Sequence, residues 1–418
     1  MTSFLAHPLT DPGGLGVPPY AVALAAVVLV AAVAVLVPIP PVAGEPSPGE
    51  GFADVDRPLG TGRRVTRALT LLGLLALVYA GRRGSGDGLS NITPPLVVGV
   101  AWAALVVASL VVRRLWTWLD PWDGAARGIE PLAGGPPAAE SDAGPPGEDP
   151  SSDSTSVWPA VAAASAVVWF LVARADSTQP RAIGAALASY TIVAVAIGVA
   201  LGRQRLAHAD VLGLSARWAG ELRDGLAVRW SVPSGAEAVL GVVAGGLLLD
   251  VARRAGAYAD VLDLVVSPAT AATPRTLAVS LLLVCAVAVG VLHVAERAGE
   301  RRGVAGTVAP AVLPVVLALV VVWRLRRLLV SLQLLPITAS DPLGRGWDLF
   351  GTRTGIVDPN PFGTAAQRWT SIVLVTSAGV VGAVALRRRV ADRAAREPAS
   401  YALYLLVGLA VLGLAVAV

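Results

Sequence analysis

Apolar residues form long runs along this chain, and charged residues collect between the runs. A helix that crosses the hydrocarbon core of a bilayer needs about 20 predominantly apolar residues. By that measure nine runs predict membrane-spanning helices. They lie near residues 20–37, 95–112, 157–173, 182–201, 235–250, 276–294, 306–323, 369–386 and 401–418.

A tenth run, from Ala68 to Gly81, has only 14 residues, a length that also suits an interfacial or re-entrant segment. The distribution of arginine decides between these interpretations, because cytoplasmic loops are richer in basic residues than outside loops. If the tenth run spans the membrane, 20 of the 33 basic residues lie on the cytoplasmic side. If it does not, the arginine-poor loops move to that side. The sequence therefore predicts an all-α bundle of ten membrane helices, with both termini extracytoplasmic.

Composition divides the predicted bundle into two parts. Residues 131–156 contain no arginine and are rich in proline, glycine, serine and acidic residues, which is typical of a disordered segment. We expect a cytoplasmic loop here, between helices one to three in residues 1–130 and helices four to ten in residues 157–418. The N-terminus has no arginine before its first apolar run, so we expect an uncleaved span there and not a secretory signal.

The overall composition fits a chain whose solvent is the bilayer. Apolar residues make up 55% and charged residues 15%, whereas about 25% of an average soluble protein is charged. We expect a multi-pass protein of the cell membrane. Its arginines flank apolar runs and contact lipid head groups there, so the net positive charge does not indicate a nucleic-acid partner. The three histidines lie far apart in the chain and no nucleotide-binding motif is present, so we expect neither a cofactor nor a metal site.

Two arginines, Arg324 and Arg327, stand at the end of the predicted helix over 306–323. If that helix starts near Gly306, Arg324 lies at the outer interface and extends toward head groups. If it starts at Pro310, both arginines lie deeper and share a face with Ser331 inside the bundle. Long basic side chains reach the interface at little cost, which favours the first interpretation. A charge buried inside the bundle would instead indicate a functional site.

Further polar residues are predicted on the same, extracytoplasmic side. Asp250 ends one apolar run, either as the ion-pair partner of Arg324 or as an acid, base or proton carrier. Asp341 and Asp348 belong to a predicted outside loop, 336–368, in which Asp341 before proline also suits a helix N-cap or an Asx turn. We predict that these residues converge on one outward-facing site. The complete predicted set is Asn91, Asp250, Arg324, Arg327, Asp341 and Asp348.

The stretch from Arg113 to Asp123 lies at the opposite, cytoplasmic end of the third predicted helix. It contains three tryptophans and two aspartates. We interpret the tryptophans as an aromatic belt at the membrane interface. Asp120 before Pro121 is expected to cap a following helix.

Several different short motifs are distributed over most of the chain's length. They are His7 before the first span, Asn91-Ile92-Thr93-Pro94, the stretch 116–122, Asp250 at the end of its run, and above all Ser340 to Gly351. With them the chain resembles a family of bacterial multi-pass membrane proteins, some of which carry a fenitrothion hydrolase label. The resemblance implies organophosphate ester hydrolysis. The chain departs from it at Trp323-Arg324 and in and just after the ninth predicted helix, where that family tends to have histidine.

Three functions follow as hypotheses. The leading one is that the outward site binds or moves a small anionic or phosphoryl-bearing ligand, which the arginines clamp while the carboxylates orient them or move protons. The second is a membrane hydrolase in which Asp341 and Asp348 position water or a metal. The third is a non-catalytic scaffold or assembly factor that uses residues 131–156 as a partner-binding arm.

Overall fold

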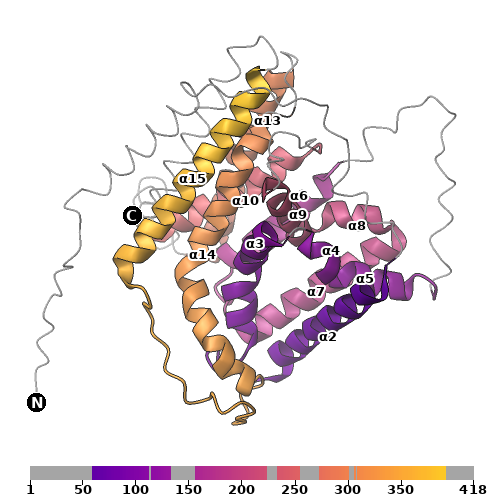
Figure 1. The fold of residues 1–418 in the computed structure, drawn as a ribbon, viewed down its shortest axis with the longest axis vertical. Helices are drawn as coiled ribbons and strands as arrows, with labels where there is room; N and C mark the ends of the chain where they lie inside the picture. Colours follow the sequence, from indigo (N-terminus) through magenta and orange to yellow (C-terminus); the bar gives the residue numbers. More distant parts are fainter. Residues whose placement is uncertain are drawn as a thin grey trace, which may run out of the picture.

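The computed structural model describes most of the chain between residues 59 and 391. The described residues are helices joined by turns and loops, without a β-strand (Figure 1). The spans predicted at 20–37 and 401–418, and nearly all of the predicted loop 131–156, lie outside them. The described ranges are 59–112, 114–132, 156–223, 233–254, 273–300, 306 and 308–391.

Thirteen helical elements are described, of which η1 is a π-helical stretch that continues directly into α3. They are α2 (Thr61–Arg83), η1 (Pro94–Ala101), α3 (Trp102–Val111), α4 (Leu115–Leu119), α5 (Pro121–Ile129), α6 (Trp158–Val172), α7 (Pro180–Ala200), α8 (Arg203–Ala209), α9 (Val211–Arg223), α10 (Ala236–Arg254), α13 (Pro274–Glu300), α14 (Val308–Ser340) and α15 (Gly363–Ala391).

Six described helices are long and apolar enough to cross a membrane. One of them is α2, whose 23 residues contain the short run from Ala68 to Gly81. The predicted spans 157–173 and 235–250 correspond to α6, which has 15 residues, and to α10. The count of ten and the side on which the termini lie stay predictions. The six spans are Thr61–Arg83, Pro94–Val111, Pro180–Ala200, Pro274–Ala298, Val308–Ser340 and Gly363–Leu386.

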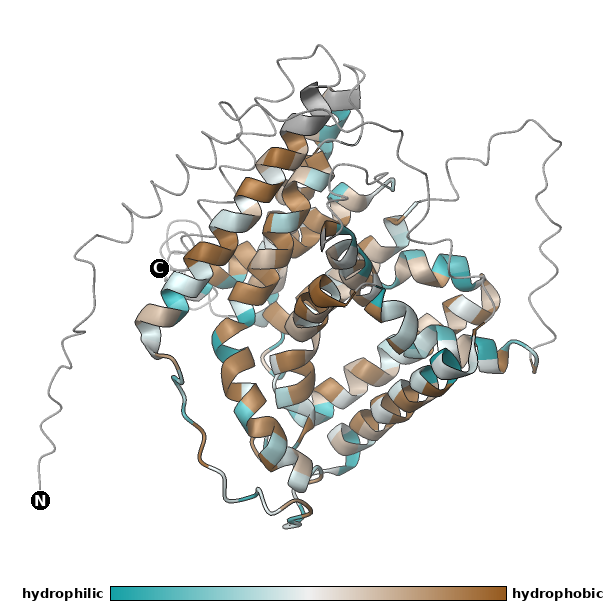
Figure 2. Cartoon of the chain, in the orientation of Figure 1, coloured by the Kyte–Doolittle hydropathy of each residue, from teal (hydrophilic) through white to brown (hydrophobic). Residues whose placement is uncertain are grey.

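Large apolar side chains are exposed along the outer faces of these helices. On α2 the exposed positions include Val65, Leu69 and Leu72, whose spacing of three and four residues places them on one helix face. On α13 they include Val287 and Val294. Figure 2 shows the hydrophobic colouring of the long helices. Contiguous apolar faces of this kind are rare on soluble proteins and mark contact with lipid or with another protein. They indicate an integral membrane protein.

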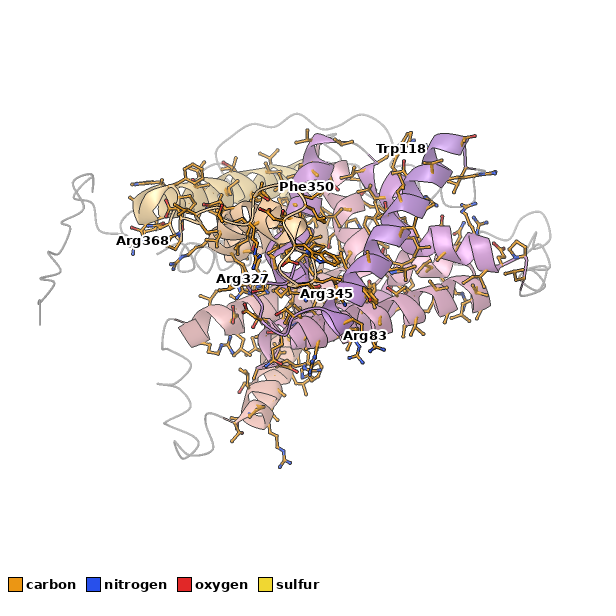
Figure 3. All side chains as sticks on the ribbon, turned by 90° about the horizontal axis from the view of Figure 1, so that it is seen from below. Arg83, Trp118, Arg327, Arg345, Phe350 and Arg368 are labelled. Carbon is orange, nitrogen blue, oxygen red and sulfur yellow. The ribbon has the colours of Figure 1, made fainter. Side chains whose placement is uncertain are left out.

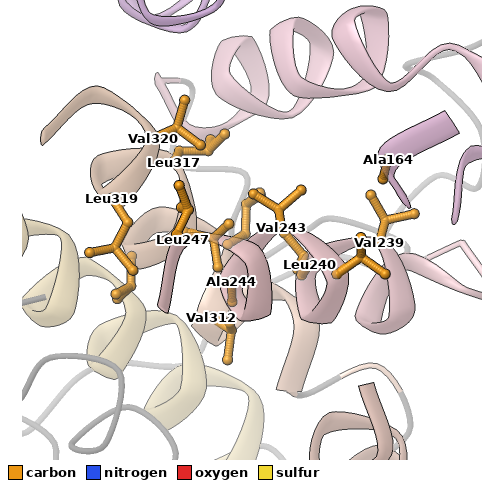
Figure 4. Packing of buried hydrophobic residues seen from close by; sticks show 14 of the residues in the cluster. Ala164, Val239, Leu240, Val243, Ala244, Leu247, Val312, Leu317, Leu319 and Val320 are labelled. Carbon is orange, nitrogen blue, oxygen red and sulfur yellow. The ribbon is translucent and has the colours of Figure 1, made fainter. Parts of the chain in front are cut away.

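The helix α14 occupies the centre of the described bundle. It has 33 residues, about 50 Å at 1.5 Å per residue, and is far longer than the predicted run 306–323. The reason is that leucine-rich sequence continues through Pro336, so the loop between α14 and α15 is 341–362 and not 336–368. From Val308 to Arg324 the helix is apolar nearly all round and almost completely buried, as expected for a core helix. Figure 4 shows Val312, Leu317 and Val320 packed against residues of α10.

Glycines allow several helix pairs to approach closely. A Cβ on Gly81 of α2 would lie 2.7 Å from the Pro180 carbonyl oxygen and 2.9 Å from the Gly184 Cα on α7. A Cβ on Gly99 of η1 would lie 2.0 Å from the Ser331 hydroxyl on α14. Small residues at such crossings are typical of membrane helix packing, where van der Waals contact drives association.

This contact predicts the effect of two matched substitutions on α2. Gly81→Val should destabilise the protein by about 1–3 kcal/mol, because its side chain collides with the backbone of α7. Gly73→Val puts the same side chain on the same helix, where no atom lies within 4 Å of the added Cβ, and should change stability little beyond helix propensity. Thermal unfolding of the purified protein in detergent measures both. Equal losses of stability would contradict this packing of α2 on α7.

Candidate functional site

A buried polar cluster joins the end of α10 to the middle of α14. The Trp323 indole Nε1 donates to Asp250 Oδ2 at 2.6 Å, and Arg253 Nη2 donates to Asp250 Oδ1 at 2.7 Å. Both carboxylate oxygens are thus hydrogen bonded, and Asp250 is only 1% exposed. The Arg324 guanidinium lies over the Trp323 ring, 3.6 Å from its centroid. The cluster forms where α6 and α10 end, since Arg253 Nη1 also donates to the Val172 carbonyl at 3.3 Å.

Arg324 does not fit the interpretation as a head-group arginine at a helix end. The helix continues for 16 residues beyond it, and the side chain is 5% exposed. Ser331 is also buried, whereas Arg327 is exposed on α14, where Figure 3 labels it. The structure therefore supports the deeper placement for Arg324 and Ser331 but not for Arg327. A charged side chain buried inside a membrane helix bundle is rare, and its presence favours a functional site there.

Positive charge predominates around the middle of α14. The stretches 247–254 and 320–331 contain five arginines and one aspartate. Among the described helices that pack on α14, η1, α3 and α15 contain no acidic residue, while α9 contributes Glu221. The acidic residues of α13 lie at its C-terminal end, where Glu296 accepts from the Val308 backbone N–H at the start of α14. A region with this balance of charge attracts anions.

The aspartates after Ser340 close the loop in which they lie. Asp341 accepts from the backbone N–H groups of Arg345 at 2.8 Å and Gly346 at 2.6 Å. These residues lie four and five positions further on, so the carboxylate closes a wider loop than an Asx turn, and no helix begins at Asp341. Asp348 Oδ1 accepts from the Ser340 hydroxyl at 2.7 Å and the Arg353 N–H at 3.2 Å. These hydrogen bonds, that of Ser340 first, hold the pKa of Asp348 below its usual range.

Asn91 lies beside this loop. Its Nδ2 donates to the Ala80 carbonyl at 2.9 Å and the Ser85 carbonyl at 3.0 Å, and it is fully buried. The loop that contains it is joined to the loop after α14, because the Ser85 N–H donates to the Leu343 carbonyl at 2.7 Å. The structure therefore brings Asn91, Asp341 and Asp348 to neighbouring loops.

The six predicted residues thus divide into two groups along α14. The distance from Arg324 to Ser340, the last residue before the loop, is about 24 Å at 1.5 Å per residue. Asp250 and Arg324 lie at the middle of the helix, with Arg327 one turn further on. The other three residues lie at its end. Because α14 is one helix through the whole interval, the structure does not bring all six residues together in one place.

A second buried polar cluster lies between α5, α7, α8 and α9, and sequence reasoning missed it. Asp120 caps α5 as predicted, with Oδ1 accepting from the Trp122 and Asp123 N–H groups. Asp210 caps α9 in the same manner, and Tyr190 of α7 donates its hydroxyl to Asp210 Oδ1 at 2.8 Å. Both aspartates are buried.

Residues 203–223, between the predicted spans 182–201 and 235–250, form α8 and α9 and cover this cluster. Consequently Trp116 and Trp122 are buried, and of the three tryptophans interpreted as an aromatic belt only Trp118 is exposed. The signal was available in the sequence: an aspartate precedes apolar positions spaced for one helix face. These positions are Val211, Leu214 and Trp218.

Burial dominates the electrostatics of this cluster. It raises the pKa of Asp120 to about 7, and the neighbouring carboxylates of Asp210 and Asp123 contribute in the same direction. Burial also raises the pKa of Asp210. Burial and then the charge of Arg217 lower the pKa of His208 to about 4. Across the described ranges, no group of three His, Cys, Asp or Glu side chains is arranged to hold a metal ion.

Together these features define an all-helical integral membrane protein with charged clusters buried among its helices. No known protein family, curated protein or solved structure matches the chain. Its function is therefore argued from its own residues.

The hydrogen bonds between Ser340 and the loop after α14 predict a local effect of Ser340→Ala. The substitution removes the donor to Asp348 and the acceptor of the Phe350 N–H, so amide hydrogen exchange over 348–353 should become faster while α14 keeps its protection. Thr338→Ala is the control, because Thr338 is buried but bonds only to carbonyls of its own helix. In the parent protein the same region should lose protection as the pH falls, since the lowered pKa of Asp348 keeps these bonds intact only while it is ionised. Unchanged exchange in Ser340→Ala would refute this assignment.

The bond between Trp323 and Asp250 predicts a larger effect in the core. Trp323→Phe keeps an aromatic ring but removes the indole N–H that donates to a buried carboxylate oxygen, which should cost about 1–3 kcal/mol. Trp169→Phe is the matched control, because Trp169 is 45% exposed. Thermal unfolding of the two variants should separate them clearly. A Trp323→Phe variant as stable as Trp169→Phe would show that Asp250 does not depend on the indole.

Proposed function

We propose that this integral membrane protein binds or moves a small anionic or phosphoryl-bearing ligand. The site lies beside the middle of α14 and faces the extracytoplasmic side of the membrane. The observation that carries the proposal is Arg324, a guanidinium 5% exposed at the middle of a membrane helix. The described helices around it supply more arginine than carboxylate. A charge at such a position costs free energy, and charged residues inside membrane helices commonly have a binding or transport role.

The surroundings of Arg324 suit anion recognition. Its guanidinium is oriented by stacking on Trp323, and the Trp323 ring is itself held by Asp250. A planar guanidinium held in one orientation can donate two parallel hydrogen bonds to a phosphoryl or carboxylate group. Less conformational freedom is then lost on binding than with a mobile surface arginine.

Two further donors follow on the same helix face. Arg327 and Ser331 lie three and seven residues after Arg324, a spacing that places the three side chains in one row. Gly99 of η1 packs directly against this row, since a Cβ there would meet the Ser331 hydroxyl at 2.0 Å and Arg327 Cγ at 3.7 Å. Exposed Arg327 would meet the anion first, and buried Arg324 would hold it.

The outer aspartates have a different role in this proposal. Asp341 and Asp348 use their carboxylate oxygens to accept hydrogen bonds from their own loop. We assign them to closing the loop at the end of α14. This use supports ligand binding in preference to the hydrolase that the family resemblance implies, because that chemistry needs carboxylates available to position water or metal.

Inorganic phosphate is the simplest probe of the site. At constant ionic strength it should raise the Tm of the purified protein in a saturable manner, because a ligand that binds only the folded state stabilises it. Arg324→Gln should weaken the apparent affinity by about 10- to 100-fold, the loss of one or two charge-assisted hydrogen bonds. Arg327→Gln should weaken it less, since Arg327 is exposed.

Arg345→Gln is the control for net charge, because Arg345 is exposed in the loop after α14, about 24 Å or more from Arg324. It should respond to phosphate as the parent protein does. The proposal is refuted if phosphate and methylphosphonate both leave the parent Tm unchanged, or if Arg324→Gln and Arg327→Gln respond like the parent.

A further inference from the structure

The buried cluster between α5, α7 and α9 contains two carboxylates that share one arginine. Asp120 is 6% exposed and Asp210 is 3% exposed. Arg217 Nη2 lies 3.9 Å from Asp120 Oδ2, and Arg217 Nη1 donates to the Ala207 carbonyl at 2.7 Å. With both aspartates ionised these three side chains carry a net charge of −1, which burial disfavours.

Hydrogen bonding distinguishes the two carboxylates. Asp210 accepts three hydrogen bonds spread over both of its oxygens, from Tyr190, Leu212 and Gly213. Hydrogen bonds donated to a carboxylate stabilise its charge, so these three donors favour the ionised form of Asp210. Asp120 differs, because Oδ1 accepts both backbone N–H groups while Oδ2 has only Arg217, beyond hydrogen-bond distance. Oδ2 is therefore the oxygen on which a proton can be placed without loss of a bond.

A tryptophan at the same place gives independent support. Trp116 is 6% exposed, and within the described part of the chain its indole Nε1–H has no acceptor. Trp116 Nε1 and Asp210 Oδ2 both border the space left by Gly213, whose missing Cβ would lie 2.5 Å from the first atom and 2.3 Å from the second. A buried indole N–H beside Asp210 is a further polar group that can stabilise the ionised form of Asp210, which leaves Asp120 as the carboxyl that takes up a proton.

We propose that Asp120 Oδ2 is a proton-binding site of this protein, occupied below neutral pH and vacated above it. Taking up the proton converts the Asp120 carboxylate to a neutral carboxylic acid and brings the charge of the three side chains from −1 to zero. Burial first, and then Asp210 and Asp123, raise the pKa of Asp120 to about 7. The site lies outside α14 and does not rest on the proposed anion site.

The other charged groups that face the pair are otherwise engaged. Asp123 forms ion pairs with Arg67 and with Arg127. The Tyr190 hydroxyl donates to Asp210. His208 has its pKa lowered to about 4, so it stays neutral in the range where Asp120 titrates. The pH dependence between about 5 and 8 is therefore assigned to Asp120.

The proton also links stability to pH. Folding raises the pKa of Asp120 from its ordinary value of 3.8 to about 7, so between these pH values the folded state holds a proton that the unfolded state has released. Its contribution to stability is fully present below pH about 4 and is lost as the pH rises through about 7. The Tm should fall over this interval, and Asp120→Asn should remove that part of the slope while it keeps the Oδ1 cap of α5.

Infrared difference spectra of the full-length protein between pH 5 and pH 9 test the site directly. We expect the carbonyl band of a protonated carboxylic acid at pH 5, lost with a midpoint near 7 in the parent protein. The band should be absent in Asp120→Asn and present in His293→Gln, a control that removes an imidazole beside Glu237, outside this cluster. Asp210→Asn should move the midpoint to lower pH, since a negative neighbour is removed, and Arg217→Gln should move it to higher pH.

The proposal is overturned if the parent protein shows no such band, or if Asp120→Asn keeps it with the same midpoint. Should Asp120→Asn fail to fold, the other two variants decide. Midpoints that stay at the parent value in both Asp210→Asn and Arg217→Gln would place the proton elsewhere.

Discussion

The hydrogen bond from the Trp323 indole to Asp250 is the interaction on which the central arrangement depends. It allows a helix that is buried and apolar over its first half to carry an arginine at its middle. A charge in such surroundings is tolerated only when neighbouring dipoles and counter-charges compensate for lost hydration. Here one carboxylate receives an indole N–H and a guanidinium, and the indole ring supports Arg324. The end of α10 is thereby joined to the middle of α14.

Polar chemistry in this protein is consequently divided among three places, each with a different charge balance. The middle of α14 has an excess of arginine, which suits an anion. The loops around Asn91 and Asp341 use their polar atoms to bond to one another, which fixes the end of the same helix. The cluster of Asp120 and Asp210 has more acid than base and little hydration, which suits a proton. The proposed anion site and the proposed proton site would together supply the elements needed to make the binding of one ligand depend on the other.

The sequence predicted the features that depend on runs of apolar residues and on local helix caps. It did not predict the features that depend on packing between helices. Apolar runs located α2, α7, α13 and α15, and Asp120 was recognised as a cap because capping is local. The length of α14 was missed, since its polar residues looked like a helix end and only contacts with η1 and α15 show that the helix continues. The division of the predicted site followed from the same error. The cluster of Asp120 and Asp210 was missed because it depends on the packing of α9, although the apolar spacing of Val211, Leu214 and Trp218 was readable in the sequence.

The most direct test of the central claim is thiol accessibility beside Arg324 in intact cells. Cys285, the one cysteine of the chain, is replaced by alanine, and a single cysteine is placed at Leu328, one turn from Arg324 with both arginines intact. A second protein carries it at Phe350, which is 68% exposed in the outer loop. The account predicts that a membrane-impermeant reagent labels both from outside, and that phosphate slows labelling only at residue 328. Labelling at 328 that needs a permeabilised membrane, or that ignores phosphate, would contradict it.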